Sequence, residues 1–200
     1  MTTHKHCYWL LLTAILSLPI DAAESYTIDT EHSIVRFSIS HFVFLTTPGH
    51  FANMTGKVTL DRVAEHGSME VAVEASTVNT GHAKRDENLR SPDFFDTALY
   101  PQISYRGEVV KFINGIPVSV EGQLTLHGIS KPVMLVIDNF KCDTDLIEND
   151  RAENIQAENK KRCSATASMK IKRSDFGMSY AIPLVGDEVM LFVEVQAHQD

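Results

Sequence analysis

Apolar and polar residues alternate with a period of two along most of the chain. Between residues 33 and 41 the apolar positions are Val35, Phe37 and Ile39, and polar residues separate them. The same alternation recurs in residues 69–75, 118–126, 133–137, 169–171 and 189–196. Because successive side chains of a strand point to opposite faces, each segment is predicted to be a β-strand with one dry face.

Turn-forming residues lie between these segments. They are Thr47-Pro48-Gly49, Glu65-His66-Gly67, Asn114-Gly115-Ile116-Pro117, His127-Gly128 and Lys131-Pro132. Such residues are typical of chain reversals, and short connections imply antiparallel neighbours. About eight strands with regular turns predict an all-β fold, either a barrel or a sandwich.

Two stretches interrupt the alternation. Residues 81–90 are rich in charge and compatible with a short surface helix, and the adjacent Phe94 and Phe95 follow at one end of the predicted barrel. Residues 143–162 are charged and amide-rich, and Cys142 and Cys163 flank them. This second stretch is predicted to be a long polar loop.

The N-terminal residues 1–23 are predicted to be a cleaved signal peptide. A weakly basic head precedes the apolar run 8–18, and Ala22 and Ala23 supply small residues for cleavage. A spanning helix needs about 20 apolar residues, which disfavours the alternative of an uncleaved membrane anchor. Residues 24–200 are then one exported domain. The remaining Cys142 and Cys163 favour one disulfide over two free thiols.

Small residues on the apolar faces raise the question of a hollow interior. Gly56, Gly122, Ala165 and Ala167 share the parity of bulky apolar neighbours. An eight-stranded barrel has room for one small ligand when its interior is not filled by side chains. An ordinary core with glycines at strand bends explains the same pattern. The alternation leaves both interpretations open.

The net charge and the absence of known motifs narrow the range of possible functions. The formal net charge is −8 and no Lys/Arg cluster is present, which argues against nucleic acid as a partner. The histidines after residue 23 are scattered without metal-ligand spacing, and no C-x-x-C, G-x-S-x-G, H-E-x-x-H or phosphate-binding glycine loop occurs. We therefore expect neither a metal site nor a catalytic centre.

Several motifs in a fixed order resemble the YceI-like family of exported, polyisoprenoid-binding, lipocalin-like proteins. The resemblance covers residues 26–197. The matching blocks are Tyr26–Asp29 with His32-Ser33, Phe37–His41, Asn79–His82, Arg85-Asp86, Leu89–Phe95, Tyr100-Pro101, Leu124–Pro132, Arg173–Gly177 and Val185–Val189.

The resemblance implies an eight-stranded antiparallel lipocalin-like β-barrel with a short helical insertion. It also implies a periplasmic protein that holds a long-chain isoprenoid, of quinone or polyprenyl type, or a similar amphiphilic lipid in its lumen. A disulfide between Cys142 and Cys163 is similar to one in a subset of the family. One departure is the loop 143–162, which lacks the Trp-Gly elements common there.

A set of residues, most of them chosen by their inward parity, is then predicted to line the lumen and bind the lipid. They are Val35, Phe37, Ile39, Phe42, Val58, Val71, Val73, Val120, Leu124, Leu135, Ala165, Ala167, Met169, Leu191 and Val193. Candidate contacts for a polar head group are His41, His82, Arg85 and Arg90. The competing role for these four is an ion-pair and capping network that fixes the insertion, with Asp86 and Asp93 as partners.

Two other functions compete with a lipid carrier: an enzyme that acts on a lipid head group, and a stress-related interaction protein with an adventitious lipid. The carrier interpretation requires no cofactor other than the bound isoprenoid or other lipid. A homodimer and a transient membrane contact are compatible with it. The alternation exposes no polar cluster toward the lumen, so a non-enzymatic carrier is favoured.

Overall fold

The computed structural model describes residues 23–42, 44–144 and 161–200. The predicted signal peptide, except for its last residue, and most of the predicted loop 143–162 lie outside the described residues. Within these ranges no helix is long and apolar enough to cross a membrane.

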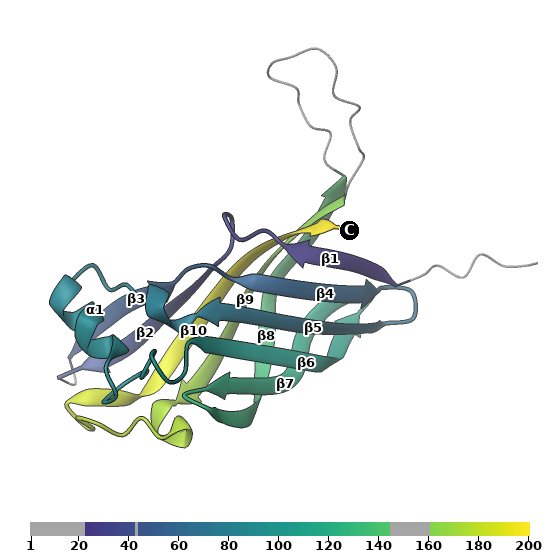
Figure 1. Ribbon diagram of the computed structural model, residues 1–200. Helices are drawn as coiled ribbons and strands as arrows, with labels where there is room; N and C mark the ends of the chain where they lie inside the picture. The colour runs from purple at the N-terminus through teal and green to yellow at the C-terminus, as the bar shows by residue number, and fades with distance from the viewer. Residues whose placement is uncertain (1–22, 43, 145–160) are drawn as a thin grey trace, which may run out of the picture.

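Ten strands make up most of the described chain (Figure 1). They are β1 (Glu24–Ile28), β2 (Ile34–His41), β3 (Leu45–Phe51), β4 (Thr55–Asp61), β5 (His66–Glu74), β6 (Gln102–Ile113), β7 (Ile116–Leu126), β8 (Ile129–Thr144), β9 (Lys161–Lys172) and β10 (Val185–Gln199). The helical segments are η1 (Ala75–Thr77), α1 (Ala83–Arg90) and η2 (Arg173–Phe176). The helix predicted over residues 81–90 is therefore confirmed.

The strands form a closed antiparallel barrel. Their order is β1-β4-β5-β6-β7-β8-β9-β10-β2-β3, and pairing of β1 with β10 closes a ring of eight. The C-terminal part of β10 pairs with β1, whereas residues Val185–Glu194 pair with β2. The β2–β3 hairpin thus extends the wall beyond the ring at the end that carries α1 (Figure 1). The predicted eight-stranded barrel is confirmed and the sandwich is excluded.

Two predicted reversals are instead parts of strands. Thr47-Pro48-Gly49 lies inside β3, the last strand of the order, where a proline is tolerated because few ladder hydrogen bonds are lost. Gly49 is opposite Phe37, and a Cβ there would lie 2.2 Å from the Phe37 ring. Lys131-Pro132 lies in the part of β8 that pairs with β7 but precedes the pairing with β9. The glycine at position 49 is thus explained by close packing against Phe37, and the two prolines by strand edges that lack a partner, so neither stretch is a turn.

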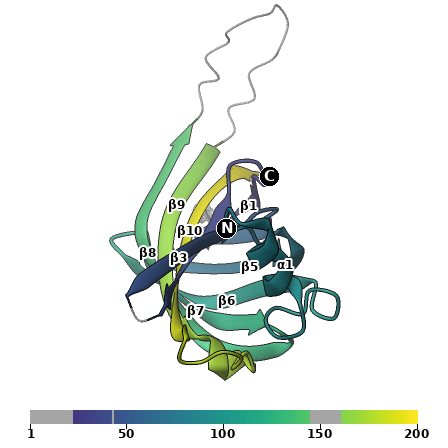
Figure 2. The same cartoon turned by 90° about the vertical axis from the view of Figure 1, so that its left-hand side faces the viewer.

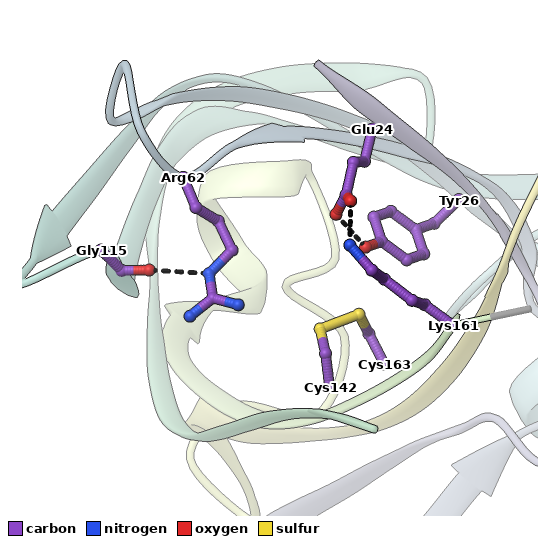
Figure 3. The surroundings of a disulfide bond; sticks show 7 residues. All are labelled: Glu24, Tyr26, Arg62, Gly115, Cys142, Lys161 and Cys163. Atoms are coloured by element: carbon purple, nitrogen blue, oxygen red, sulfur yellow. Dashed lines mark hydrogen bonds and ion pairs between the residues drawn. A yellow bond between two sulfur atoms is a disulfide. The ribbon is translucent and has the colours of Figure 1, made fainter. Parts of the chain in front are cut away.

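The barrel end opposite α1 is held by a disulfide and a polar cluster (Figure 3). Cys142 on β8 and Cys163 on β9 are register partners, and their sulfur atoms are bonded, which confirms the predicted pair. Tyr26 donates a hydrogen bond to Glu24, whose carboxylate also pairs with Lys161. Closing a loop with a separation of 21 residues is worth about 3 kcal/mol in the chain-entropy model.

Candidate functional site

The barrel encloses a cavity of about 720 Å³. Its walls are mostly apolar side chains, contributed by every strand of the eight-stranded ring and by the β2–β3 hairpin. This volume lies within the range of small-molecule binding sites, about 300–1,000 Å³. The interior is therefore hollow, and the question that the alternation left open is answered by the structure.

Most residues predicted to face the lumen line this cavity. They are Val35, Phe37, Ile39, Val58, Val71, Val73, Val120, Leu124, Leu135, Ala165, Ala167, Met169, Leu191 and Val193. The period of two correctly identified the inward face because the strands are long and regular. Whether these residues bind a ligand is a separate question from their position.

Phe42 is the exception, and its predicted place in the lumen is wrong. Strand β2 ends at His41, and Phe42 is out of parity with the inward-facing Phe37 and Ile39. Phe42 has a positive φ of 51° and an exposed side chain, and its ring lies 4.1 Å from that of His41. The backbone turn redirects the side chain away from the interior.

The alanines and glycines differ in their effect on the cavity. Ala167 on β9 is opposite Ile137 and Val193, and all three line the cavity, so the small side chain leaves space. Gly122 leaves no free space, because a Cβ there would lie 2.7 Å from Cζ of Tyr105. Gly56 has a φ of +146°, and its Cβ would lie 2.2 Å from the Glu70 carbonyl oxygen. These two glycines serve close strand packing, so the predicted contribution of both to the hollow is wrong.

Tyr105 fills the space over Gly122 and is fixed there by two hydrogen bonds. Its hydroxyl lies 2.8 Å from the Val120 carbonyl oxygen and 3.0 Å from that of Val133. Burial raises the pKa of Tyr105 to about 12, so the phenol is neutral at physiological pH. Its ring contributes an apolar surface to the cavity wall.

The cavity opens beside α1. Among the lining residues that the structure describes, the exposed ones are His82, Lys84, Arg85 and Asn88, all on α1 or at its N-cap. The lining residues at the other end, such as Tyr26, Leu60 and Cys163, are buried. Figure 2 looks at the end of the barrel that carries α1 and the β2–β3 hairpin. The site is therefore a deep, mostly apolar cavity with a polar mouth beside α1.

The predicted head-group residues divide into two sets. His41, His82 and Arg85 line the cavity at its mouth. Arg90 does not, because its guanidinium donates to the carbonyl oxygens of Ser76 and Val78 at 2.8 and 3.0 Å. The contacts of Arg90 therefore fit the competing role, in which it fixes the insertion. Its partners are backbone carbonyl groups and not the predicted Asp86 and Asp93.

Arg85 and Asp86 both contact Thr80, just before α1. The Arg85 Nε donates to the Thr80 hydroxyl at 2.7 Å, and Asp86 accepts from the Thr80 backbone N–H at 2.8 Å. Asp86 is buried, so these bonds stabilise the first turn of α1 over the mouth. Arg85 thus combines a structural contact with a position at the opening.

Arg173 is a lining residue that the sequence-based prediction missed. Its buried guanidinium donates to the carbonyl oxygens of Met178, Gly186, Tyr180 and Val185, at 2.7 to 3.0 Å. Burial lowers its pKa, and Asp187 opposes the shift, but a guanidinium remains charged. Arg173 continues the inward parity of Met169 and Ile171, which was the available signal. It fixes residues 178–186, which form part of the barrel end.

The described side chains offer few groups for metal-dependent chemistry. Within residues 23–42, 44–144 and 161–200, no group of three or more His, Cys, Asp or Glu side chains is placed to hold a metal ion. The arrangement is suited to holding an elongated apolar molecule whose polar end remains at the mouth.

Comparisons with known proteins agree with this architecture. The family model described as the YceI-like domain matches residues 26–197. Protein YceI of Escherichia coli O157:H7 is 33% identical over 180 residues, which cover 88% of each chain.

Two solved structures share the fold. The Burkholderia cenocepacia protein BcnA superposes with a TM-score of 0.64 and 20% identity, covering 84% of this chain and 98% of that one. A domain from Saccharophagus degradans, described as polyisoprenoid binding and implicated in plant cell wall breakdown, gives a TM-score of 0.61 with 16% identity. This alignment covers 88% of this chain and 99% of the domain. At these identities the likeness concerns the fold alone.

Proposed function

The chain belongs to the YceI-like domain family, and from that premise we propose that it is a periplasmic, non-enzymatic carrier of a long-chain isoprenoid lipid. The lipid chain, of quinone or polyprenyl type, occupies the barrel cavity, and its polar head lies at the mouth beside α1. The single observation that carries this proposal is the mostly apolar cavity of about 720 Å³ with a polar mouth beside α1.

The physical chemistry of the cavity supports an apolar chain as its occupant. Each buried CH₂ group contributes about 0.8 kcal/mol to transfer out of water. A few isoprene units therefore supply most of the binding energy without a strong polar anchor. His41, His82 and Arg85 at the mouth are the proposed contacts of the head group.

Two further observations support the proposal. A protein of the same fold, the Saccharophagus degradans domain, is described as polyisoprenoid binding. The disulfide between Cys142 and Cys163 is typical of proteins exported to an oxidising compartment.

The titratable groups favour binding over catalysis. Burial raises the pKa of Tyr26 and Tyr105, and both hydroxyls donate hydrogen bonds to protein acceptors. A hydrogen bond from His198 is the largest cause that lowers the pKa of Asp29, which is not a lining residue. Tyr26 and Tyr105 line the cavity, but protein acceptors occupy their hydroxyls, whereas a catalytic group would be free to contact the substrate.

We expect affinity to increase with isoprenoid chain length. Delipidated protein titrated with geraniol, farnesol and geranylgeraniol should bind each longer alcohol roughly tenfold or more tightly, because each isoprene unit buries several CH₂ groups. Affinity should reach a plateau once the chain fills the cavity. Isothermal titration calorimetry measures the dissociation constants.

The recovered ligand separates a carrier from an enzyme. Mass spectrometry of the alcohols after long incubation should return them unchanged. Equal affinity for all three alcohols would contradict burial of the chain in the cavity. Chemical conversion of the ligand by the purified protein would instead favour the enzyme that acts on a lipid head group.

A further inference from the structure

Two exposed apolar segments lie side by side at the α1 end of the barrel. The first is the tip of the β2–β3 hairpin and the second is the connection from η2 to β10. Together we call them the apolar rim, which consists of Phe42, Phe44, Leu45, Tyr180, Ile182 and Leu184. Phe44 is 92% exposed and Leu184 is 58% exposed. Apolar side chains displayed in a contiguous group mark an interaction surface.

Backbone contacts join the two segments. The Phe42 N–H donates to the Leu184 carbonyl oxygen at 2.8 Å, and Val185 pairs with His41 where β10 meets β2. On the other side, Arg173 holds the connection through its bonds to Tyr180 and Val185. These hydrogen bonds therefore fix the two segments of the rim relative to each other and to the barrel.

The rim is continuous with the mouth of the cavity. His41 precedes Phe42 and lines the cavity, and Thr47 lines it from β3. Met178 and Val185, on either side of the second segment, also line it. Figure 1 places the hairpin and α1 at the same end of the barrel. A molecule leaving the cavity would thus emerge beside the rim.

Charged residues at the α1 end, such as Lys84 and Arg85, lie on α1, whereas the two segments of the rim carry no charge. Residues 37–56 and 176–186 contain no Asp, Glu, Lys or Arg, in a chain of net charge −8. At the opposite end Val63 and Ile113 are also exposed, but the neighbouring turn carries Arg62 and Glu65. Charged groups resist entry into an apolar phase, so the uncharged rim is the surface suited to one.

We propose that the apolar rim docks onto the surface of a lipid bilayer, so that the lipid passes between the bilayer and the cavity without crossing water. Aromatic side chains such as Phe42, Phe44 and Tyr180 are suited to the membrane interface. The transfer step depends on the proposed carrier function. Docking itself depends only on the rim.

The test uses a double variant in which Phe44→Ser and Leu184→Ser are combined. Both side chains are exposed and neither lines the cavity, so the fold and the interior are preserved. The full chain, expressed with export, is floated with phosphatidylcholine vesicles. We expect the vesicle-bound fraction of the variant to fall roughly tenfold or more, because two large apolar contacts are lost.

Transfer of a fluorescent probe measures the second part of the proposal. Protein loaded with an anthraniloyl ester of geranylgeraniol is mixed with the same vesicles, and release of the probe is followed over time. The variant should load the same amount of probe as wild type but deliver it roughly tenfold more slowly. A matched control combines Val63→Ser with Ile113→Ser, which are 77% and 55% exposed at the opposite end, and should behave as wild type.

The outcomes separate the two proposals. If wild type binds the probe but the rim variant floats and delivers it at the wild-type rate, membrane docking is overturned while the carrier function stands. If wild type retains no probe yet needs the rim to float, docking stands and the carrier function fails. If sedimentation shows that the rim variant dissociates a dimer, with flotation and delivery unchanged, the rim joins two copies of the chain and docking is overturned.

Discussion

Replacing Ala167 with phenylalanine is expected to remove the bound lipid without unfolding the barrel. Ala167 is buried on β9, lines the cavity, and lies between Ile137 and Val193, which line it as well. A phenyl ring at this position enters space that the lipid chain would occupy. Since that space is hollow, the ring meets no close-packed neighbours that it must displace.

Lipid extraction and thermal unfolding of the ligand-free protein measure both effects. We expect Ala167→Phe to co-purify with little or no lipid and to melt, when ligand-free, at or above the wild-type temperature. The matched control is Ser168→Phe, which adds the same ring on the outer face of β9, opposite Val136 and Phe192. It should retain the lipid. A loss of about 1–3 kcal/mol of stability in Ala167→Phe, with wild type free of lipid, would show a solid core instead.

Replacing Arg173 with leucine is expected to cause the largest loss of folding stability. The guanidinium satisfies four carbonyl oxygens, and leucine leaves them without donors in a buried setting. Each unsatisfied buried group costs about 1–3 kcal/mol, and water entering the site recovers part of this. We expect a decrease of at least about 3 kcal/mol in the free energy of unfolding, measured by denaturant titration.

Arg173→Lys separates the hydrogen-bond fork from the charge. Lysine retains a positive charge but lacks the planar five-donor guanidinium, so it cannot reach all four carbonyl groups. Its stability should lie between that of wild type and Arg173→Leu. Stability of Arg173→Leu within about 0.5 kcal/mol of wild type would mean that residues 178–186 are held by other contacts.

The inward-facing residues were predictable because their positions follow from backbone geometry alone. Side chains such as Phe37, Leu124 and Leu191 lie within regular strands, where alternation and burial coincide. The helix α1 and the pairing of Cys142 with Cys163 were likewise predictable, from local composition and from the resemblance to the family.

The errors arose where tertiary contacts decide the outcome. The sequence around Gly122 does not indicate that Tyr105, on the neighbouring strand, fills the space above it. Pro48 has the composition of a turn, yet its strand is the last in the order and tolerates it. Phe42 is apolar but out of parity with Val35, Phe37 and Ile39, and the strand ends one residue before it. In each case the outcome depends on a residue that is distant in the sequence or on a change in the direction of the backbone.

The mouth of the cavity was predicted only in part, because His41, His82 and Arg85 line it but Arg90 does not. Its position depends on α1, which lies near the β2–β3 hairpin only after the barrel has closed (Figure 2). Arg173 continued the inward parity, but its role depends on residues 178–186 folding back over it. Both features are properties of the barrel end, where strand periodicity no longer applies.

The central claim, that the barrel carries a long-chain isoprenoid, is tested most directly by native mass spectrometry of the protein purified from its own host, with lipid extraction and identification. We predict one lipid per chain, with an isoprenoid tail that fits a cavity of about 720 Å³. Protein recovered from its own host with an empty cavity, and with no isoprenoid in the extract, would contradict the account.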